Sequence, residues 1–450
     1  MRPLQISNRR KIAVIGTGIS GMAAAWLLSQ RHDITVYEKQ GRLGGHSNTV
    51  EVETADGLIP VDTGFIVFND VTYPNLNALF EHLGVRSIET DMSFGVSLEG
   101  GAREYSTVRP SAFLCGGRNL FSPRFYSMLW DLQRFYRKAP LDFSFMMSEN
   151  ISLGDYLALR GYGEAFQRDH LLPQAAAIWS ASVAEIKSYP ACAFVRFFEN
   201  HGLLKMNVAE RPRWRTVLGG SRAYVRALTA AYADRVRVGC GAVAVARKAD
   251  SVWVQDAEGK LERYDDVVIA THGDEALALL GDASAEERRL LGAFRYAPNR
   301  AVLHSDPTLM PRRKPLWASW NYVGDNPEGG CVVSYWMNLL QGFSSPTPIF
   351  LTLNPQRMPR ADLIHYEIEY DHPLYDAASL RAQREIWSLQ GVRNTWFCGA
   401  HFGAGFHEDG LQAGLAVAEQ LGGVRRPWTV TDESGRIHIM EPATPRELAA

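Results

Sequence analysis

The sequence predicts an α/β fold with two interleaved domains, one built on a parallel sheet and the other mixing helices and strands. Three observations lead to this expectation. Residues 11–38 read as strand, glycine turn, helix and strand, the unit from which parallel sheets are built. Two short apolar runs, 265–271 and 395–400, are typical of further buried strands. Between them lie a mostly helical stretch, 120–202, and a strand-rich one, 301–355.

The composition is that of an ordinary globular protein. Of 450 residues, 46% are hydrophobic and 21% charged, and 47 basic against 49 acidic residues give a net charge of −2 at pH 7. A chain with almost no net charge lacks the excess of basic residues that binding to the nucleic-acid phosphates requires, so no nucleic-acid partner is expected. No apolar stretch reaches the roughly 18 residues of a membrane-spanning helix. The polar start and five scattered cysteines favour a cytoplasmic protein without signal peptide or disulfide framework.

The N-terminal unit carries a dinucleotide-binding fingerprint. In Gly16-Thr-Gly-Ile-Ser-Gly21, the first glycine permits the tight turn, the second lets the backbone approach a pyrophosphate, and the third allows close helix–strand packing. The helix N-terminus attracts phosphate, and Glu38 at the end of the next strand binds ribose hydroxyls. The predicted contacts are Gly16, Gly18, Ile19, Ser20, Gly21, Glu38 and Lys39.

A second glycine pattern, 239–244, lies between two segments expected to form a hairpin, 235–238 and 251–254. No helix follows it, so it is not interpreted as a nucleotide site. With a single valid fingerprint, no separate NADPH domain is expected. The electrons of any redox reaction then come from the organic substrate.

Three segments resemble the flavin amine oxidase superfamily, which includes phytoene desaturases and protoporphyrinogen oxidases. They are Gly41-Arg-Leu-Gly-Gly-His46, Val61-Asp-Thr-Gly-Phe65 and the strand, glycine turn and helix of 395–414. The resemblance implies a Rossmann-type FAD-binding domain interleaved with a mixed α+β substrate domain. It implies non-covalent FAD, because Cys398 lies in the strand before the C-terminal turn and not within the turn. It extends the expected cofactor contacts to Arg42, Gly44, Gly45, His46, Thr63, Gly64, Val243, Thr271, Gly399, Gly410 and Leu411.

The expected domain boundaries follow this layout. The FAD-binding domain is expected to comprise 8–115, 213–295 and 376–425. The substrate domain is expected to comprise a helical part, 116–212, and a sheet, 296–375, and residues 426–450 are expected to form a loosely packed tail.

The helical part raises the question of a membrane surface. Apolar residues from Phe121 to Tyr136 share one helical face, with five basic residues beside them, and a similar stretch covers 194–206. This pattern is typical of an interfacial helix on anionic lipid. A core helix with a basic edge explains it equally well. On the first interpretation the protein lies peripherally on the inner face of the cell membrane.

The His46 turn, the 62–65 segment and the run 405–410 more closely resemble a bacterial subgroup of flavoproteins that accompanies cyclopropane-fatty-acyl-phospholipid synthase-like enzymes. This resemblance implies desaturation or isomerisation of a phospholipid-bound fatty acyl chain. Two alternatives stay open: an amine oxidase that produces hydrogen peroxide, and a non-catalytic lipid-binding escort protein of the same fold. The oligomeric state is left open.

The candidates for acid–base chemistry are His401, His407 and Glu408, near the expected flavin, and Tyr322 and Tyr335, in the expected cavity. Each has a structural alternative, since a histidine in a glycine-rich turn often hydrogen-bonds the backbone. Asp409 can equally cap the helix. No third ligand has a recognisable spacing to the two histidines, so no metal is expected.

Overall fold

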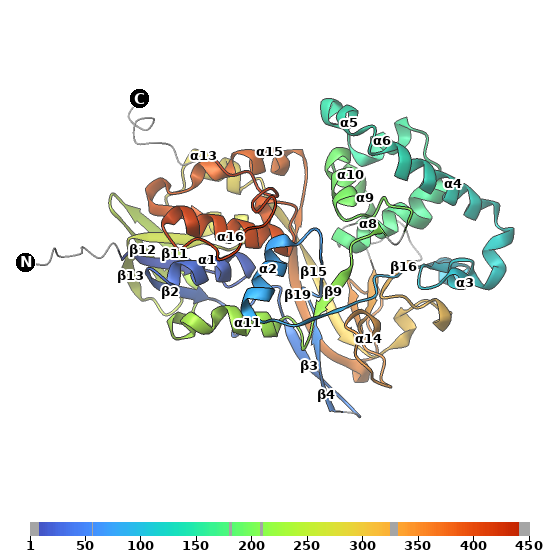
Figure 1. The fold of residues 1–450 in the computed structure, drawn as a ribbon, viewed down its shortest axis with the longest axis horizontal. Coiled ribbons are helices and arrows are strands. Elements are labelled where there is room, and N and C mark those ends of the chain that lie inside the picture. The colour runs from blue at the N-terminus through green and yellow to red at the C-terminus, as the bar shows by residue number, and fades with distance from the viewer. Residues whose placement is uncertain (1–8, 56, 180–181, 208–209, 325–331, 441–450) are drawn as a thin grey trace, which may run out of the picture.

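The structure is a computed structural model that describes residues 9–440 except 56, 180–181, 208–209 and 325–331. One half of the molecule contains a five-stranded parallel sheet with the order β10-β2-β1-β14-β20 (Figure 1). Its strands are β1 (Lys11–Ile15), β2 (Asp33–Glu38), β10 (Val236–Val238), β14 (Asp266–Ile269) and β20 (Thr395–Phe397). The central strand therefore comes from the beginning of the chain and one edge strand from its last sixty residues.

Two helices from opposite ends of the chain pack against each other in this domain. In α1 (Ile19–Ser29) every residue but the last is buried, and α16 (His407–Leu421) is buried over most of its length. A Cβ atom on Gly414 would lie 2.1 Å from the carbonyl oxygen of Ser20, so only glycine permits this close crossing. Further helices of this half are α2 (Pro74–Leu83), α11 (Arg222–Thr229), α12 (Gly273–Leu279), α13 (Ala285–Leu291) and α15 (Ala377–Glu385).

Three small antiparallel sheets complete this region. The strands β11 (Ala242–Lys248), β12 (Ser251–Asp256) and β13 (Leu261–Tyr264) form the first. The hairpin β3 (Thr49–Thr54) and β4 (Gly57–Asp62) forms the second. The third contains β5 (Val67–Asn69), β6 (Ser87–Glu89) and β9 (Trp214–Val217), with β9 in the middle.

The other half contains a seven-stranded sheet with the order β19-β15-β18-β17-β16-β7-β8, antiparallel except between β16 and β7. Its long strands β15 (Arg295–His304) and β19 (Ile364–Leu374) run through the middle of the molecule (Figure 1). The remaining strands are β7 (Phe94–Leu98), β8 (Arg103–Ser106), β16 (Trp320–Gly324), β17 (Val333–Trp336) and β18 (Phe350–Leu353), and the short helix α14 (Met337–Leu340) follows β17.

A group of helices covers one side of this sheet (Figure 1). They are α3 (Pro110–Phe113), α4 (Pro123–Lys138), α5 (Phe143–Glu149), α6 (Leu153–Leu159), α7 (Glu164–Phe166), α8 (Leu172–Trp179), α9 (Val183–Ser188) and α10 (Ala191–Asn200). A π-helical turn, Gln167–Leu171, joins α7 to α8. None of the helices that the structure describes is long and apolar enough to cross a bilayer.

The helix expected to lie on a membrane, α4, directs most of its predicted lipid-facing side into the protein. Phe125, Met128, Phe135 and Tyr136, on its predicted lipid-facing side, are all buried in the substrate domain. The second stretch, 194–206, is buried over 194–198 except at Arg196, while Met206 at its end is 56% exposed. These two apolar faces are core, because neighbouring helices supply the cover that the sequence interpretation assigned to lipid.

Other expectations need correction as well. The segment 8–115 extends too far, because β7 and β8 belong to the seven-stranded sheet. The strand β10 pairs with β2 in the parallel sheet and is not part of a hairpin. Ser221, whose place directly before α11 predicts an N-cap, does not cap the helix, because its hydroxyl donates to Asp62.

The chain after α16 is anchored through several of its side chains up to Ile437, against the expectation of a loose tail, while residues 438–440 are exposed. Arg426 is 2% exposed and bonds Asn75 of α2, and Arg436 is ion-paired with Asp409 at 2.7 Å. Trp428 stacks on Trp26 of α1. Residues 441–450 lie outside the described residues.

Candidate functional site

A single cavity of about 1440 Å³ connects the two halves of the molecule. One end, here called the cradle, is lined by the glycine turn after β1 and by the segments that follow β2, β14 and β20. The other end, the chamber, is lined by residues of the seven-stranded sheet and of α8 and α10. The volume exceeds that of an ordinary small-molecule site, about 300–1,000 Å³, which fits a cavity for two ligands.

The glycine turn leaves the cradle open where a phosphate would lie. Gly16 has φ +98°, and a Cβ there would meet the carbonyl oxygen of Ala270 at 2.9 Å. A Cβ on Gly18 would meet no atom within 4 Å, and no side chain caps the N-terminus of α1. The unpaired N–H groups of this helix end therefore face the cavity, as an anion requires.

Glu38 and Arg42 occupy the two positions expected of a ribose acid and a phosphate cation. Glu38 lines the cradle and accepts hydrogen bonds from the backbone N–H groups of Thr17 and Gln40 at 3.1 and 2.7 Å. Arg42 donates through Nη1 to the carbonyl of Gly45 at 2.7 Å, while its buried Nη2 has no partner among the described residues. A buried guanidinium nitrogen without an acceptor fits a cofactor phosphate.

The two segments beside the expected flavin ring are held together by hydrogen bonds. The N–H of Phe65 donates to the carbonyl of His46 at 2.8 Å, and a Cβ on Gly64 would lie 2.1 Å from that oxygen. Thr63 and Tyr370 bond through their hydroxyls at 2.8 Å, and Tyr370 stacks on His46 at 4.9 Å. The His46 turn therefore has one position relative to β19.

Most of the predicted cofactor residues line the cavity. They are Gly16, Gly18, Ile19, Ser20, Glu38, Lys39, Arg42, Gly44, Gly45, His46, Thr63, Gly64, Val243, Thr271 and Gly399. Gly21 does not, and serves the close helix–strand contact instead, 2.1 Å from its Cβ position to the carbonyl oxygen of Gly16.

Gly410 and Leu411, also predicted as cofactor contacts, lie outside the cavity lining. Both are buried within α16, and the N–H of Gly410 donates to the carbonyl of Phe406 as part of the helix. The residues that reach the cavity here are those just before the helix and its first residue, Ala404 to His407. The C-terminal motif therefore meets the cavity about one turn before Gly410.

Six histidines line the cavity: His46, His201, His272, His372, His401 and His407. The rings of His272 and His372 lie 6.1 and 5.6 Å from that of His46. Burial is the main reason that the pKa of His46 lies well below its usual value. Burial likewise lowers the pKa of His372 to about 4 and those of His401 and His407 to about 3. These four imidazoles are therefore neutral at neutral pH.

His407 is fixed at the start of α16. Its ring stacks on Phe65 with centroids 3.7 Å apart, and its Nε2 bonds the hydroxyls of Ser47 and Tyr224 at 3.0 and 2.8 Å. Nδ1 is thus the ring nitrogen that remains for a ligand. His401 lies at the cavity wall with its Nε2 buried and without a partner among the described residues. Both predicted histidines reach the cavity.

Glu408 does not, and its prediction as a catalytic residue is corrected. Its side chain is fully buried and accepts hydrogen bonds from the N–H groups of Asn75 and Leu76, from the Asn75 amide and from Gln412. It ties α2 to α16. Asp409 accepts from the N–H of Phe406 at 2.7 Å, which is the capping role left open above.

The two predicted tyrosines separate. Tyr335 lines the chamber and donates to the carbonyl of Ala177 at 3.4 Å. Tyr322, two residues along β16 from the cavity-lining Trp320, lines a smaller cavity of about 230 Å³. Because side chains alternate between the two faces of a strand, Trp320 and Tyr322 lie on the same face of β16. They line different cavities because they lie at different positions along the strand. Tyr322 is therefore not a residue of the main cavity.

Sequence reasoning missed several residues of the site. His272, directly before α12, and Tyr370 and His372, on β19, belong to segments without a recognisable motif, and they meet His46 only in the folded chain. Phe406 stacks on Phe197 of α10 at 4.9 Å and closes the chamber beside the cradle. Its place directly before the predicted His407 was the one available signal.

Comparisons with known proteins place this geometry. Residues 14–83 match the family model described as an NAD(P)-binding Rossmann-like domain. The chain is 25% identical over 259 residues to a Mycobacterium tuberculosis protein whose name gives a flavin-containing monoamine oxidase, which is 56% of this chain and 54% of that protein. It is 37% identical over 84 residues to protoporphyrinogen oxidase 2 of Arabidopsis thaliana, 18% and 16% of the two chains. The chain thus spans about half the length of the first of these relatives and less of the second.

Two solved structures extend the likeness to almost the whole chain. A fatty acid isomerase from P. acnes that produces CLA aligns with a TM-score of 0.65 and 16% identity, over 92% of this chain and 98% of that one. A putrescine oxidase bound to putrescine aligns with a TM-score of 0.67 and 13% identity, over 92% and 99%. The chain therefore has the two-domain fold of amine-oxidase-like flavoproteins, and the cofactor expected for its Rossmann-type domain is FAD.

Proposed function

We propose that the protein is an FAD-dependent oxidoreductase that acts on lipid, desaturating or isomerising a phospholipid-bound fatty acyl chain. The observation that carries this proposal is the continuous cavity, which leads from the dinucleotide cradle directly into a chamber with apolar walls. The wall residues include Met92, Phe94, Ile178, Trp179, Phe197, Leu203, Trp320, Leu351 and Leu353. Such a lining stabilises a hydrocarbon chain and excludes water.

Bound FAD would supply a hydride acceptor, and a C–H bond beside a double bond is the easier donor. The residues of this chain position the two partners. Arg42 and the N-terminus of α1 would hold the phosphates, and the His46 turn packs against Tyr370 at the far end of the cradle. The neutral histidines bring no net charge to the meeting point of cradle and chamber, which favours an apolar substrate.

An amine substrate is the second candidate, and the names of the relatives favour it. A cationic amine is best held by a free carboxylate. Two carboxylates at the chamber end are already engaged: Asp91 accepts from Ser93 and Ser319, and Glu89 is 3.7 Å from Arg213. Glu369 and Asp371 of β19 also line the cavity, so the preference for a lipid rests on the apolar walls of the chamber and not on a lack of carboxylates. The escort alternative, in turn, requires no intact cofactor cradle.

The test uses purified protein loaded with FAD under anaerobic conditions. Vesicles of monounsaturated phospholipid are expected to bleach the visible flavin band if the chain is desaturated, with a product lighter by two hydrogens. Isomerisation instead moves the double bond without net flavin reduction or mass change. Bleaching by putrescine or another amine, with peroxide formed in air and no change in any lipid, would establish the amine oxidase. A protein that refuses FAD would favour the escort.

A further inference from the structure

The outer side of α4 and the loop before it carry an unusual set of exposed side chains. Phe121 is 89% exposed, Trp130 71% and Tyr126 50%, and Leu120 beside them is also exposed. Tyr126 and Trp130 are one helical turn apart, on the side opposite the buried Phe125 and Met128. Large aromatic residues this exposed are a cost in water, so a contiguous group of them indicates a contact surface.

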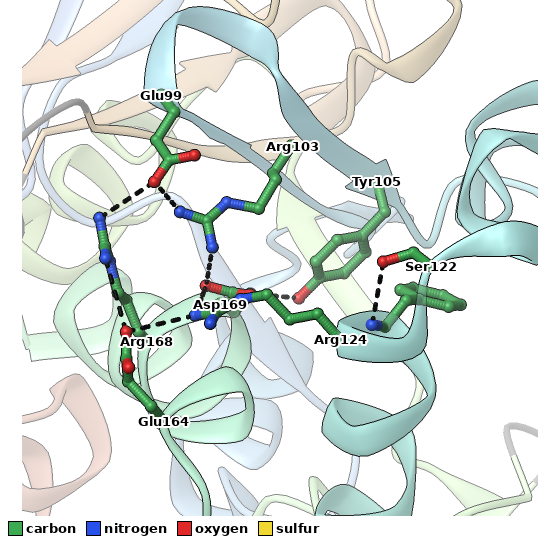
Figure 2. Close-up of polar contacts among 9 residues, drawn as sticks. Glu99, Arg103, Tyr105, Ser122, Arg124, Glu164, Arg168 and Asp169 are labelled. Carbon is green, nitrogen blue, oxygen red and sulfur yellow. Dashed lines mark hydrogen bonds and ion pairs between the residues drawn. The ribbon is translucent and has the colours of Figure 1, made fainter.

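The loop and the helix form one surface because they are bonded to each other. Ser122 caps α4 by accepting from the N–H of Phe125 at 3.2 Å (Figure 2). The Tyr126 hydroxyl donates to the carbonyl of Leu120 at 3.1 Å. Leu120, Phe121, Tyr126 and Trp130 are therefore presented together.

Basic residues surround these aromatics without matching acids. Arg118, Arg137 and Lys138 are exposed and form no ion pair with any residue that the structure describes. Arg137 lies two turns beyond Trp130 on the same side of the helix. Asp131, the one acid in the sequence of α4, is buried and paired with Arg134 at 2.8 Å.

The other cation of this region, Arg124, is already neutralised. Its guanidinium bonds Asp169 of the π-helical turn at 2.7 and 3.1 Å and approaches Glu164 at 3.5 Å, as Figure 2 shows. Arg118, Arg137 and Lys138 are therefore the unpaired cations in the described part of this region, while Arg124 and Arg134 are ion-paired with Asp169 and Asp131. The surface defined by Arg118, Leu120, Phe121, Tyr126, Trp130, Arg137 and Lys138 is called the aromatic–basic face.

We propose that the aromatic–basic face docks the protein on an anionic phospholipid bilayer. Aromatic side chains that enter the headgroup region, with lysine and arginine beside them, are the composition of interfacial helices. The net charge of the chain is −2, so attraction to anionic lipid must be local, and this face supplies it. A second copy of the chain fits less well, because a two-fold contact would bring the same cations toward one another.

The experiment measures co-sedimentation of the FAD-loaded protein with vesicles of phosphatidylcholine, with and without phosphatidylglycerol. Binding to the anionic vesicles is expected, weakened by salt and much lower on phosphatidylcholine alone. The double variant Phe121→Ser/Trp130→Ser is expected to lower the partition coefficient by about tenfold or more, since the two apolar anchors are lost. Arg137→Gln/Lys138→Gln is expected to lower it by about tenfold on anionic vesicles only.

Matched controls lie in the nucleotide-binding half. Leu261→Ser replaces an apolar residue of β13 that is 55% exposed, and Arg31→Gln removes an exposed cation after α1. Both are expected to bind vesicles like the wild type. Equal binding by all variants, equal loss in all of them, or a dimer that the aromatic substitutions dissociate would each overturn the proposal.

The role of this face in delivering substrate rests on the proposed function, but the binding does not. Vesicle binding is measured without turnover. A protein that binds through this face but leaves every lipid unchanged would contradict the proposed function alone. Lipid turnover in detergent with no vesicle binding would contradict the docking face alone.

Discussion

The cradle and the chamber differ in how the chain builds them. The cradle consists of short contiguous segments, such as 16–20 and 42–46, in which glycines and backbone N–H groups make the contacts. The chamber is assembled from side chains of β16, β17, β18, α8 and α10, which are far apart in the sequence. The cradle is thus sensitive to single backbone positions, whereas the chamber distributes its contacts over many replaceable side chains.

The largest expected effect is that of Gly18→Asp in the cradle. The new side chain enters open space, so the fold is retained, but its carboxylate faces the expected pyrophosphate. Repulsion between this carboxylate and the pyrophosphate is expected to weaken FAD binding by about a hundredfold or more. Equilibrium dialysis of the apoprotein measures it, with Gly18→Ala as control and a thermal melt to check folding. Normal flavin content in the aspartate variant would show that the phosphates lie elsewhere.

Arg42→Ala tests the same half through a side chain. Loss of a charge-assisted hydrogen bond to phosphate is expected to weaken FAD binding by about ten- to a hundredfold. Arg42→Lys keeps the charge but not the fork of donors, and is expected to recover part of the affinity. Fluorescence titration of the three proteins measures the order wild type, lysine, alanine. If alanine and lysine bind alike, the unpartnered Nη2 does not meet a phosphate.

On the chamber side, His201→Phe is expected to change the pH dependence of stability. His201 is 3% exposed, and burial lowers its pKa to about 3. Between that value and the unfolded value of about 6.5 the unfolded chain binds more protons, so stability falls as pH decreases. At about pH 5 this costs the wild type about 2 kcal/mol, which phenylalanine does not incur.

Urea unfolding of the apoproteins at about pH 7.5 and pH 5 measures this difference. The variant is expected to lose about 2 kcal/mol less than the wild type between the two conditions. Other buried groups also make the stability depend on pH, and not all in the same direction. Burial raises the pKa of Asp62 to about 6, so this carboxyl stabilises the fold as the pH falls and opposes the destabilisation by His201. The comparison with the variant isolates His201. Parallel curves would mean that this imidazole titrates normally.

The smallest effect is expected of Tyr335→Phe. The hydroxyl donates a long hydrogen bond, 3.4 Å, to the carbonyl of Ala177, and loss of this bond is expected to cost less than about 1 kcal/mol and to leave FAD affinity unchanged. Turnover of the acyl substrate is expected to stay within about fivefold of the wild type. A fall of several hundredfold, at full flavin content, would make Tyr335 a catalytic residue and the chamber as position-sensitive as the cradle.

The same contrast explains what could be predicted from the sequence. The fingerprint glycines, Glu38 and the His46 turn were recognisable because a tight turn and a close backbone approach demand particular residues at fixed spacing. The chamber offers no such constraint, since any large apolar side chain fills its wall. His372 and Tyr370 therefore carried no local signal, although they pack directly on His46.

The wrong predictions have physical reasons of their own. Glu408 was expected to act on protons because it follows His407, but on a helix adjacent residues point about 100° apart, and its carboxylate turns toward α2. The larger apolar stripe of α4 was predicted to face lipid. Within α4 that stripe is core, and the exposed Tyr126 and Trp130 occupy the opposite side, while Phe121 of the predicted stripe precedes the helix and is exposed.

The parallel sheet has a consequence for biosynthesis. Its edge strand β20 and the helix α16 that packs on α1 are made last, after some 390 residues have already left the ribosomal peptidyl centre. The nascent N-terminal turn alone lacks the wall that β20 and its following loop provide. A complete cradle therefore forms only once the segment after β20 has been translated, hundreds of residues after the glycine turn that it faces.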